Sequence, residues 1–514
     1  MKDNNFIISV TPDIALDLGY TYAGGLGVLE GDKFYAASKL NLNYIVFSLF
    51  YKNGYVDYDF DTNDNPIPKP QIQPEEFLKN LKLSDEINIQ LRNENIKIQV
   101  LEYIKGNSKV VFFNPISPEW ASKLTERLYI EENQEVRFFK YVLLAKSSAT
   151  YIRKNIPLED IEYIDLQEAY AAVLPLILKI PGKYRMVIHT AGPWGHPTFS
   201  RELFKKEFQY SFVDQDIVLT EIGLSVAKQA FAVSIKHFDI LLKIFPHHSE
   251  KFTFVTNGIN LDRWMNSKLR EELYGIRMDR FIDIRKELKE KLIDYLSKIK
   301  DINLDNKFIA IWARRIVPYK RPDFPVRLLS SIKDKPIVLV LGGKAHPYDF
   351  EGLEYMRIFR KLHKENEKVI YIPNYSLEIA KLLLSGGDLL LFTPFSGWEA
   401  CGTSYMKAAV NGVPTLASID GGVLEFIVNN VNGWLFGKDI RELIDYKSQK
   451  AKEINEEEYS EFQSLFLRIS DMYFNEPEDY YRVALNALRT FIFRANIERV
   501  LKEYYPNIIK KTIV

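Results

Sequence analysis

The chain has 514 residues, 46% of them hydrophobic and 26% charged, a composition typical of globular proteins with room for two domains. Lys+Arg and Asp+Glu each number 68, so the net charge is zero and neither a nucleic acid nor an anionic membrane is expected as a partner. A single cysteine, Cys401, excludes an internal disulfide, no apolar run could span a membrane and the start lacks a secretory signal, so we expect a cytoplasmic protein.

A glycine-rich turn follows the first apolar stretch. Gly24, Gly25 and Gly27 precede a helical pattern that runs to Leu40, and a buried strand is predicted at residues 44–49. Glycines before a helix let the backbone approach a ligand closely with its N–H groups. The spacing is not that of the G-x-G-x-x-G dinucleotide fingerprint, and from the residues alone a tight structural turn is the simpler interpretation.

The next stretch combines a hairpin, a helix and a strand that ends in a histidine. Residues 96–104 and 109–113 predict the hairpin, and the pattern of residues 124–153 is helical. A short buried strand at 185–189 ends in His189, followed by Gly-Pro turns. Ligands bind at the carboxyl ends of strands in open α/β sheets, so His189 is a candidate, although a loop histidine without a task explains the pattern equally well.

A boundary between two domains is predicted near residue 265. The strand at residues 252–256 is followed by Asn257, which on its own predicts an Asn-Gly turn. Residues 266–301 are then rich in charged residues with helical periodicity. Neither an H-E-x-x-H motif nor a cysteine cluster occurs, so no metal site is expected.

A second series of strands separated by helical stretches follows, which predicts a doubly wound parallel sheet. Two such halves suggest an α/β protein with two Rossmann-like doubly wound domains facing a cleft, the glycosyltransferase-B architecture. We expect the domains at residues 1–265 and 266–480, with a helix at 481–514 bracing the first. The strands of the second series are predicted at residues 307–312, 336–342, 368–372, 388–392 and 415–419.

Two clusters of chemistry follow strands of this second series. Four cations lie within residues 314–321, which is usually a solvated helix start but could bind a dianionic phosphate in a cleft. Glu399 precedes a Gly-Thr-Ser turn at 402–404 that opens a helix running through Lys407 to Asn411. Such a turn offers an anion site. The ordinary alternatives are a helix cap and a solvated surface lysine.

The run E-A-C-G-T-S-Y-M-K-A-A-V-N-G-V, residues 399–413, resembles the segment of the α-glucan phosphorylases whose lysine holds pyridoxal phosphate as a Schiff base. Further stretches resemble this family in the same order along the chain. They are GGLGVLEGD, HTAGPWGH, TNGINLDRW and ARRIVPYKR, and they are most similar to the short, unregulated members.

The resemblance implies roles for individual residues. The catalytic residues would be Lys407, Arg315, Lys320, Glu399 and His189. The cofactor would be bound by Lys407, Arg314, Thr403, Ser404, Tyr375, Asp420 and Gly421. The substrate would be bound by Gly25, Leu26, Asn257, Tyr319 and Gly402.

The implied reaction is phosphorolysis of the end of an α-1,4-glucan such as glycogen or maltodextrin. Inorganic phosphate would capture the glucosyl group as glucose 1-phosphate with retention of configuration, and the phosphate of the cofactor would relay a proton. A homodimer is kept among the expected states. The sequence departs from the family at residues 165–170, where only Glu168 of an H-x-N-E-G-H segment survives.

Two other functions remain open from the sequence. A nucleotide-sugar glucosyltransferase of the glycogen synthase type would share the architecture, the acid at Glu399 and the cation pair, but would not need Lys407. A non-catalytic glucan-binding paralogue is suggested by residues 165–170 and by the bulky Tyr405.

Overall fold

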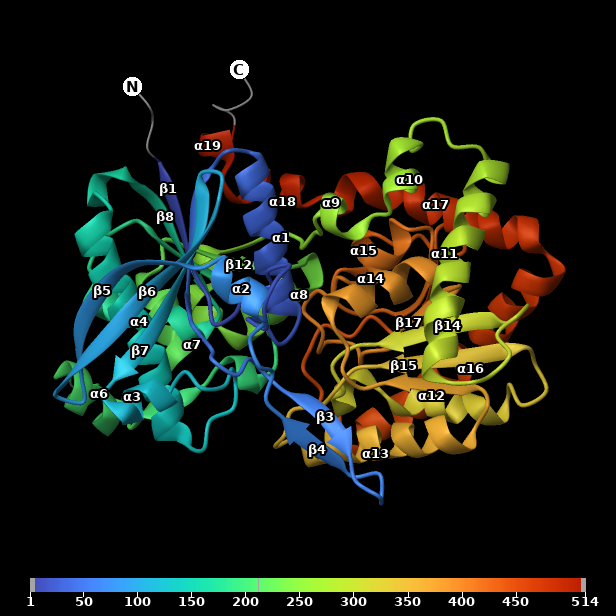
Figure 1. Ribbon diagram of the computed structural model, residues 1–514, viewed down its shortest axis with the longest axis horizontal. Coiled ribbons are helices and arrows are strands. Elements are labelled where there is room, and N and C mark those ends of the chain that lie inside the picture. The colour runs from blue at the N-terminus through green and yellow to red at the C-terminus, as the bar shows by residue number, and fades with distance from the viewer. Residues whose placement is uncertain (1–4, 211, 510–514) are drawn as a thin grey trace. The chain divides into compact units, whose positions relative to one another are not determined.

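The computed structural model describes residues 5–210 and 212–509, and the chain divides into two compact units (Figure 1). A hairpin from the N-terminal half belongs to the second unit, and the last described residues belong to the first. The expected domain boundaries near 265 and 480 stay a prediction. The first unit comprises Met1–Tyr55, Pro70–Thr256 and Val500–Val514, and the second comprises Val56–Lys69 and Asn257–Arg499.

Among the described residues, the first unit is built on a mixed sheet of nine strands. The strand order is β13-β12-β9-β8-β1-β2-β7-β6-β5, with β5/β6 and β6/β7 antiparallel and the other neighbours parallel. The strands are β1 (Phe6–Val10), β2 (Asn43–Leu49), β5 (Lys82–Leu91), β6 (Glu94–Lys105), β7 (Ser108–Ser117), β8 (Ile161–Gln167), β9 (Tyr184–Val187), β12 (Gln229–Ala232) and β13 (Phe252–Phe254).

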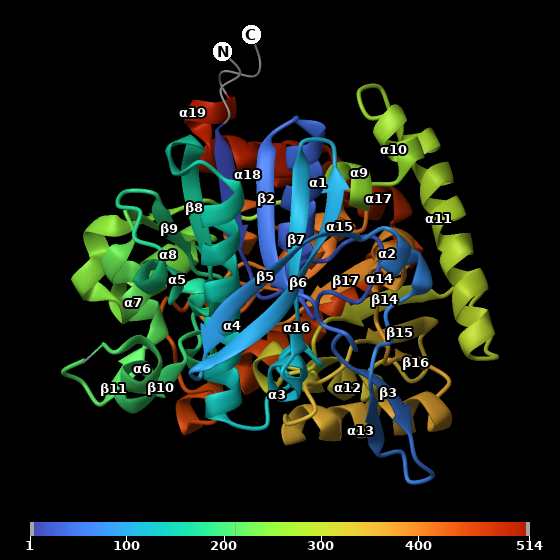
Figure 2. The same ribbon diagram turned by 60° about the vertical axis from the view of Figure 1, so that its left-hand side comes forward.

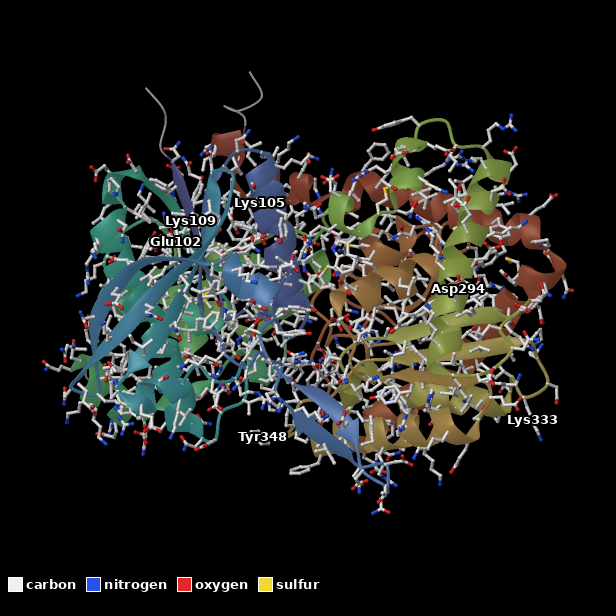
Figure 3. The ribbon with its side chains drawn as sticks, in the orientation of Figure 1. Glu102, Lys105, Lys109, Asp294, Lys333 and Tyr348 are labelled. Atoms are coloured by element: carbon white, nitrogen blue, oxygen red, sulfur yellow. The ribbon has the colours of Figure 1, made fainter. Side chains whose placement is uncertain are left out.

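The predicted hairpin is confirmed as β6 and β7, with a third antiparallel strand, β5, that the sequence analysis missed. Lys109 on β7 contacts Glu102 on β6 at 2.9 Å (Figure 3). The hydroxyl of Tyr151 donates to the same Glu102 oxygen at 2.7 Å. This cross-strand pair and the tyrosine fix the hairpin against the helix that carries Tyr151.

Helices cover the parallel part of this sheet. α1 packs against β2 and β7, whereas α4 packs against β2 and β5 (Figure 2). The prediction of a helix over 124–153 was too long, because α4 begins only after Asn133, whose side chain accepts the N–H of Val136 and caps it. The helices are α1 (Gly25–Lys39), α2 (Glu75–Lys79), α3 (Glu119–Lys123), α4 (Gln134–Asn155), α5 (Leu174–Ile177), α6 (Arg201–Phe208), α7 (Leu219–Val226), α8 (Ile235–Ile244) and α19 (Pro506–Ile509). The strands β10 (Thr198–Ser200) and β11 (Asp216–Val218) form a separate antiparallel pair.

A buried ion pair holds the C-terminal residues on this sheet. The Asp165 carboxylate accepts two hydrogen bonds from Arg185, at 2.7 and 2.8 Å, and both side chains are almost fully buried. Arg185 also donates to the carbonyl of Tyr504, and the hydroxyl of Tyr505 donates to Asp165 at 2.7 Å. Asp165 therefore acts as a structural residue, although it lies in the segment that departs from the family pattern.

Within the described part of the chain, the second unit has a sheet of six parallel strands in the order β16-β15-β14-β17-β18-β19. This is the order of doubly wound nucleotide-binding folds, so the expected α/β class is confirmed. The five predicted strands are present within one or two residues, and β19 was missed. The strands are β14 (Phe308–Ala313), β15 (Ile337–Gly342), β16 (Val369–Ile372), β17 (Leu389–Phe392), β18 (Thr415–Ser418) and β19 (Trp434–Phe436).

The hairpin of β3 (Asp57–Phe60) and β4 (Pro66–Lys69) packs on this unit. The backbone N–H of Tyr58 donates to Asn374 at 2.8 Å, and Lys344 pairs with Asp57 at 2.7 Å. The helices of the unit are α9 (Leu261–Trp264), α10 (Ser267–Glu271), α11 (Met278–Ile299), α12 (Asp323–Arg327), α13 (Phe350–Glu365), α14 (Leu377–Gly386), α15 (Ser404–Ala409), α16 (Gln449–Asn475) and α17 (Pro477–Ala495), and α18 (Ile497–Tyr504) runs from this unit into the first.

Replacing Asp165 by asparagine tests the buried pair. Asp165→Asn leaves the Arg185 guanidinium buried without a counter-charge, so we expect a loss of about 3–5 kcal/mol in the free energy of unfolding. Urea denaturation followed by circular dichroism measures this loss. As a control, Asp479→Asn removes an exposed pair with Arg482 and should change little. Equal midpoints for the two variants would contradict the role assigned to Asp165.

Candidate functional site

The strand order of the second unit reverses between β14 and β17, which are neighbours although β15 and β16 lie between them in the chain. Open α/β sheets bind ligands at the carboxyl ends of the strands beside such a switch point. The loops that follow these two strands carry Arg314, Lys320 and Glu399. The topology therefore brings the two sequence clusters, far apart in the chain, to one edge of the sheet.

The carboxylate of Glu399 lies between two cations. Its Oε2 is 3.2 Å from Arg314 Nη2 and 3.3 Å from Lys320 Nζ. No more than 13% of any of these three side chains is exposed. Charges removed from water interact more strongly, so this is a tightly coupled cluster. Three of the predicted site residues are thus in direct contact.

Burial opposes the charge on each member of the cluster. For Glu399, the cations Lys320 and Arg314 outweigh burial and bring the pKa of the carboxyl below its usual value. For Lys320, burial outweighs the attraction of Glu399 and lowers the pKa of the amine to about 7. Burial also lowers the pKa of Arg314. Lys320 therefore titrates in the neutral range, where Glu399 stays charged.

Asp420 holds the loop that carries Glu399. Its carboxylate accepts the backbone N–H groups of Gly397 and Glu399, each at 2.7 Å. Gly421 follows with a φ of 59°, and a Cβ at this position would lie 2.9 Å from the carbonyl oxygen of Glu399. A glycine is needed there because both the backbone angle and the space exclude a side chain. Asp420 and Gly421 thus shape the loop, and their contact with a cofactor stays a prediction.

The other cations of the motif diverge from this cluster. Arg315 is exposed, whereas Arg321 is buried and pairs with Glu458 on α16 at 2.6 Å. Tyr319 is buried, and its ring stacks on that of Trp398 with centroids 5.9 Å apart. Arg321 is therefore structural. The side chain of Arg315 reaches solvent. The ring of Tyr319 packs against Trp398, which directly precedes Glu399.

A glycine lets two strand ends approach each other. Gly343 follows β15 with a φ of 124°, and a Cβ there would lie only 1.9 Å from the carbonyl oxygen of Arg314. The neighbouring Gly342 leaves room for Tyr375, whose half-buried ring would lie 3.4 Å from an added Cβ. The predicted cofactor residue Tyr375 therefore lies beside the end of β15.

The amine of Lys407 is buried against an aromatic ring. Only 7% of the residue is exposed, and Nζ lies 4.0 Å from the centroid of the Trp264 indole. Asn411 joins the two segments, since its Nδ2 donates to the carbonyl oxygens of Trp264 at 2.8 Å and Lys407 at 2.9 Å. A solvated surface lysine, the ordinary expectation for this residue type, is therefore ruled out.

The helix that carries Lys407 is shorter than predicted. α15 has six residues and ends before Asn411, and Thr403 at its start makes no side-chain cap hydrogen bond. So short a helix aligns few peptide dipoles, so the anion site expected at Thr403 and Ser404 gains no support from the helix end. Gly402 lies close to the strand, because a Cβ there would be 2.7 Å from the ring of Phe392.

Tyr405, the bulky residue in the motif, is fully buried. Its ring contacts those of Phe392 and Phe426, with centroids 5.3 and 5.7 Å apart, and its hydroxyl lies 3.9 Å from Cys401 Sγ. The aromatic core of the unit therefore accommodates this ring.

Unpaired polar atoms mark the same region. In the part of the chain that the structure describes, Nε and Nη1 of Arg314 and Oδ1 of Asn257 are buried without a hydrogen-bond partner. The Nδ2 of Asn257 donates to the carbonyl of Cys401 at 3.2 Å, which holds the amide beside the Glu399 loop. Buried polar groups are nearly always paired, so these atoms indicate a ligand with anionic oxygens and hydroxyl groups.

The strand order of the first unit reverses between β1 and β8. Gly24 caps α1 without a side chain, and a Cβ at Gly24 or Gly25 would meet nothing within 4 Å. At Gly27, in contrast, a Cβ would lie 2.6 Å from Asp13 Oδ2. Gly25 is exposed and Leu26 half-buried, so the backbone N–H groups at the start of this 15-residue helix are open to a ligand.

His189 follows β9 and is held by two residues from the end of β8. Its Nε2 lies 2.8 Å from Gln167 Oε1, and its backbone N–H donates to Glu168 Oε1 at 3.0 Å. Burial, followed by the charge of Lys33, lowers the pKa of the imidazole to about 3. Burial raises the pKa of Glu168 to about 8. Both side chains are therefore largely uncharged at pH 7.

His196, the second histidine of the HTAGPWGH stretch, bonds to Thr220 at 2.8 Å, and burial lowers its pKa to about 4. Two residues near these positions were missed by the sequence analysis. His237 on α8 is buried with a pKa lowered to about 3, and no motif or strand end singles it out. Asp13, which accepts the N–H of Ala23 at 3.0 Å, could have been found as an acid between a strand and a glycine-rich turn.

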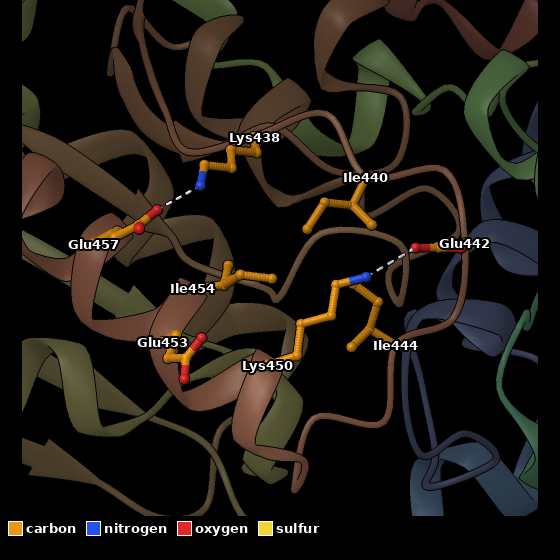
Figure 4. A pocket seen from close by; sticks show the side chains of 8 residues that line it. All are labelled: Lys438, Ile440, Glu442, Ile444, Lys450, Glu453, Ile454 and Glu457. Atoms are coloured by element: carbon orange, nitrogen blue, oxygen red, sulfur yellow. Dashed lines mark hydrogen bonds and ion pairs between the residues drawn. The ribbon is translucent and has the colours of Figure 1, made fainter.

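A surface hollow of about 310 Å³ lies elsewhere in the second unit (Figure 4). It lies between α16 and the loop before it, and two ion pairs, Lys438–Glu457 and Lys450–Glu442, flank it. None of the predicted site residues lines it. The hollow is therefore not the candidate site.

Within residues 5–210 and 212–509, no group of three or more His, Cys, Asp or Glu side chains is arranged to hold a metal ion. His248 pairs with Glu221 at 2.7 Å instead. Over the same two ranges, no helix is both long and apolar enough to cross a bilayer.

Comparison with known proteins adds independent findings. Residues 276–498 match the family model described as carbohydrate phosphorylase. An uncharacterized protein of Methanocaldococcus jannaschii is 25% identical over 95% of this chain and 96% of its own length. A maltodextrin phosphorylase of Thermococcus litoralis is 24% identical over 96% of this chain and 69% of its own length. A glycogen phosphorylase of Aquifex aeolicus is 25% identical over 81% of this chain and 73% of its own length.

The family match falls on the unit that holds the Arg314–Glu399–Lys320 cluster and the buried Lys407. The phosphorylases also align with the chain well beyond that segment. Together with the motifs at the strand ends, these matches show that the chain resembles the carbohydrate phosphorylases.

Proposed function

We propose that the protein is an α-glucan phosphorylase, a glycosyltransferase that moves the terminal glucosyl group of an α-1,4-glucan to inorganic phosphate. The product is glucose 1-phosphate, and the configuration at the sugar is retained. The proposal extends this resemblance by naming substrate, product and cofactor. We place the reaction in the cytoplasm, in keeping with a chain that has a single buried cysteine.

One observation carries this proposal. Arg314 has two buried N–H donors without a partner in the described chain, beside a Glu399–Lys320 pair at the switch point of a parallel sheet. Leaving such donors unpaired is costly unless a ligand accepts from them. A phosphate group offers the required oxygens, and charge-assisted hydrogen bonds to a guanidinium are strong.

The side chains of the second unit have separate tasks in this proposal. Lys320 and Arg315 bind the substrate phosphate, and their charges stabilise the negative charge that moves between phosphate and glucan oxygen. Two oxygen-bearing side chains accept hydrogen bonds from hydroxyl groups of the sugar. They are Glu399, whose backbone Asp420 holds, and Asn257, whose Oδ1 is unpaired. Orientation of the sugar by such fixed groups lowers the barrier by several kcal/mol.

The first unit supplies uncharged groups. His189 is neutral at pH 7 and bonds the transferred sugar through its ring. The open N–H groups of Gly25 and Leu26 at the start of α1 bind phosphate and sugar oxygens. Neither position needs a charge of its own.

Pyridoxal phosphate fits the residues around Lys407. The amine is buried on the Trp264 ring, and the unpaired donors of Arg314 suit a phosphate group. When bound, pyridoxal phosphate supplies a second phosphate group that exchanges a proton with the substrate phosphate. Lys407 would hold it covalently, and Arg314 and Tyr375 would orient it.

The alternatives lose support from two observations. A glucosyltransferase of the glycogen synthase type has no use for a buried amine, yet the amine of Lys407 is buried against the Trp264 ring, and Asn411 holds the Lys407 backbone carbonyl. The non-catalytic alternative was motivated by Tyr405 and by residues 165–170. Tyr405 packs into the core, and Asp165 forms a structural ion pair.

Replacing Lys407 tests the cofactor assignment. We expect Lys407→Ala to abolish the absorbance of bound pyridoxal phosphate and to lower phosphorolysis by about 10³-fold or more, because the cofactor loses its attachment and its proton relay. The spectrum before and after borohydride reduction measures the first effect, and phosphate-dependent release of glucose 1-phosphate measures the second. Lys335→Ala, which removes an exposed partner of Asp471, is the control. Wild-type activity in Lys407→Ala would reject the assignment.

The lowered pKa of Lys320 predicts a pH-dependent anion site. Sulfate keeps two charges over the neutral range, so its affinity should report the charge on Lys320. Below pH 7 the amine is protonated and binding is strong, whereas above pH 7 affinity should fall by at most about tenfold per pH unit. Calorimetric titration with sulfate between pH 6 and pH 9 measures this. Lys320→Arg should flatten the profile, because arginine stays charged. The same slope in wild type and variant would show that another group titrates.

A further inference from the structure

Gln167 connects His189 to the core of the first unit. Its Oε1 lies 2.8 Å from His189 Nε2, and its Nε2 donates to Ser9 Oγ on β1 at 3.0 Å. Gln167 itself is fully buried at the end of β8. The amide therefore has both ends occupied, which fixes its position between β1 and the loop that carries His189.

The hydrogen bond from the ring determines which nitrogen carries the proton. An amide oxygen only accepts, so the ring nitrogen that faces it must donate. His189 then carries its proton on Nε2, and Nδ1 keeps a lone pair. A neutral ring of this kind accepts a hydrogen bond at Nδ1 and cannot donate one there.

Glu168 holds the backbone of the same histidine. Its Oε1 accepts the N–H of His189 at 3.0 Å. Glu168 has a φ of 58° and a ψ of −174°, a conformation that residues other than glycine rarely adopt. Backbone strain of this kind persists only where the surroundings fix it. Two consecutive residues thus hold His189, Gln167 through the ring and Glu168 through the backbone.

These two residues lie in the segment that departs from the family pattern. Asp165 in this segment pairs with Arg185, while Gln167 and Glu168 hold His189. The segment therefore holds His189 in place, the histidine to which we assign sugar binding.

We propose that Gln167 is a positioning residue that fixes His189 as the Nε2–H tautomer, so that Nδ1 accepts a hydrogen bond from a hydroxyl of the transferred sugar. The inference rests on the proposed function only for the identity of the sugar. A sugar that lacks the matching hydroxyl leaves Nδ1 without a partner, so the contact selects for a hydroxyl donor. The neutral state of the imidazole at pH 7 agrees with this role.

The tautomer can be measured directly. Full-length protein labelled with ¹⁵N at histidine gives separate Nδ1 and Nε2 signals, and the signals of His189 are assigned by their loss in His189→Asn. We expect wild-type His189 to be the Nε2–H form between pH 6 and pH 8, without any substrate present. Predominance of the Nδ1–H form would overturn the proposal.

Variants at Gln167 separate positioning from stability. Gln167→Leu removes the acceptor at similar volume, so both tautomers should appear and kcat for phosphorolysis should fall by about 10-fold to 100-fold, with the KM for phosphate unchanged. Gln167→Glu keeps an acceptor, and should restore the Nε2–H form while shifting the pH profile to higher pH as the carboxylate favours a charged ring. If Gln167→Leu does not fold, Gln167→Asn, whose amide is too short to reach the ring, takes its place.

A matched control excludes general effects of losing an amide. Gln99→Leu removes a half-buried glutamine on β6 that bonds Asn114 at 3.2 Å, and it should leave the tautomer unchanged. An unchanged tautomer in Gln167→Leu, or in Gln167→Asn where that variant takes its place, would contradict the proposal. A wild-type enzyme that shows the Nε2–H form but releases no glucose 1-phosphate would refute the proposed function and leave the positioning role intact.

Discussion

The buried carboxylate of Glu399 is the interaction on which the candidate site of the second unit depends. Arg314 and Lys320 can be buried together only because this carboxylate lies between them, at 3.2 and 3.3 Å. Two unpaired cations in the same place would repel each other and lose their hydration, at a cost of several kcal/mol. Asp420 in turn fixes the Glu399 backbone, so the whole arrangement rests on one loop between β17 and α15. The Glu399 carboxylate offsets the cost of burying the two cations only in part, since burial lowers the pKa of Lys320 to about 7 and Arg314 keeps unpaired donors.

At the strand ends of the first unit, the cost of burying charges is avoided because the buried groups are neutral. At its strand ends the ionisable groups His189 and Glu168 have pKa values that burial moves to about 3 and about 8, so both are largely neutral at pH 7. Two pairs of buried charges in this unit neutralise each other, Asp165 with Arg185 and Glu30 with Lys33. Neutral donors and acceptors cost less to bury than ions, and they bind hydroxyl groups well.

Parts of this arrangement could be predicted from the sequence, and parts could not. β14 and β15 were found within one or two residues because parallel strands buried on both faces are continuous apolar runs. The start of α4 was misplaced because residues 124–133 keep apolar spacing without forming a helix, and β19 is too short to give a pattern. The motif residues at the strand ends were found, but the burial of Lys407 on Trp264 depends on residues far apart in the chain, as does the contact of Gln167 with His189.

The two sheets position their candidate site residues in the same way, but these residues are ionised in one sheet and neutral in the other. In each, the strand order reverses at one point, and the residues of interest follow the strands beside it or, for His189, the next strand in the sheet. What differs is the nearest neighbours, because ionised side chains face each other after β14 and β17, whereas neutral ones meet after β8 and β9. In the proposed reaction the sugar is uncharged and the nucleophile is a phosphate, so neutral groups suit the first and ionised groups suit the second. The division follows from local pairing. The Glu399 carboxylate keeps its charge beside Lys320 and Arg314, whereas burial neutralises Glu168, whose partners, Thr190 and the backbone N–H of His189, are uncharged hydrogen-bond donors.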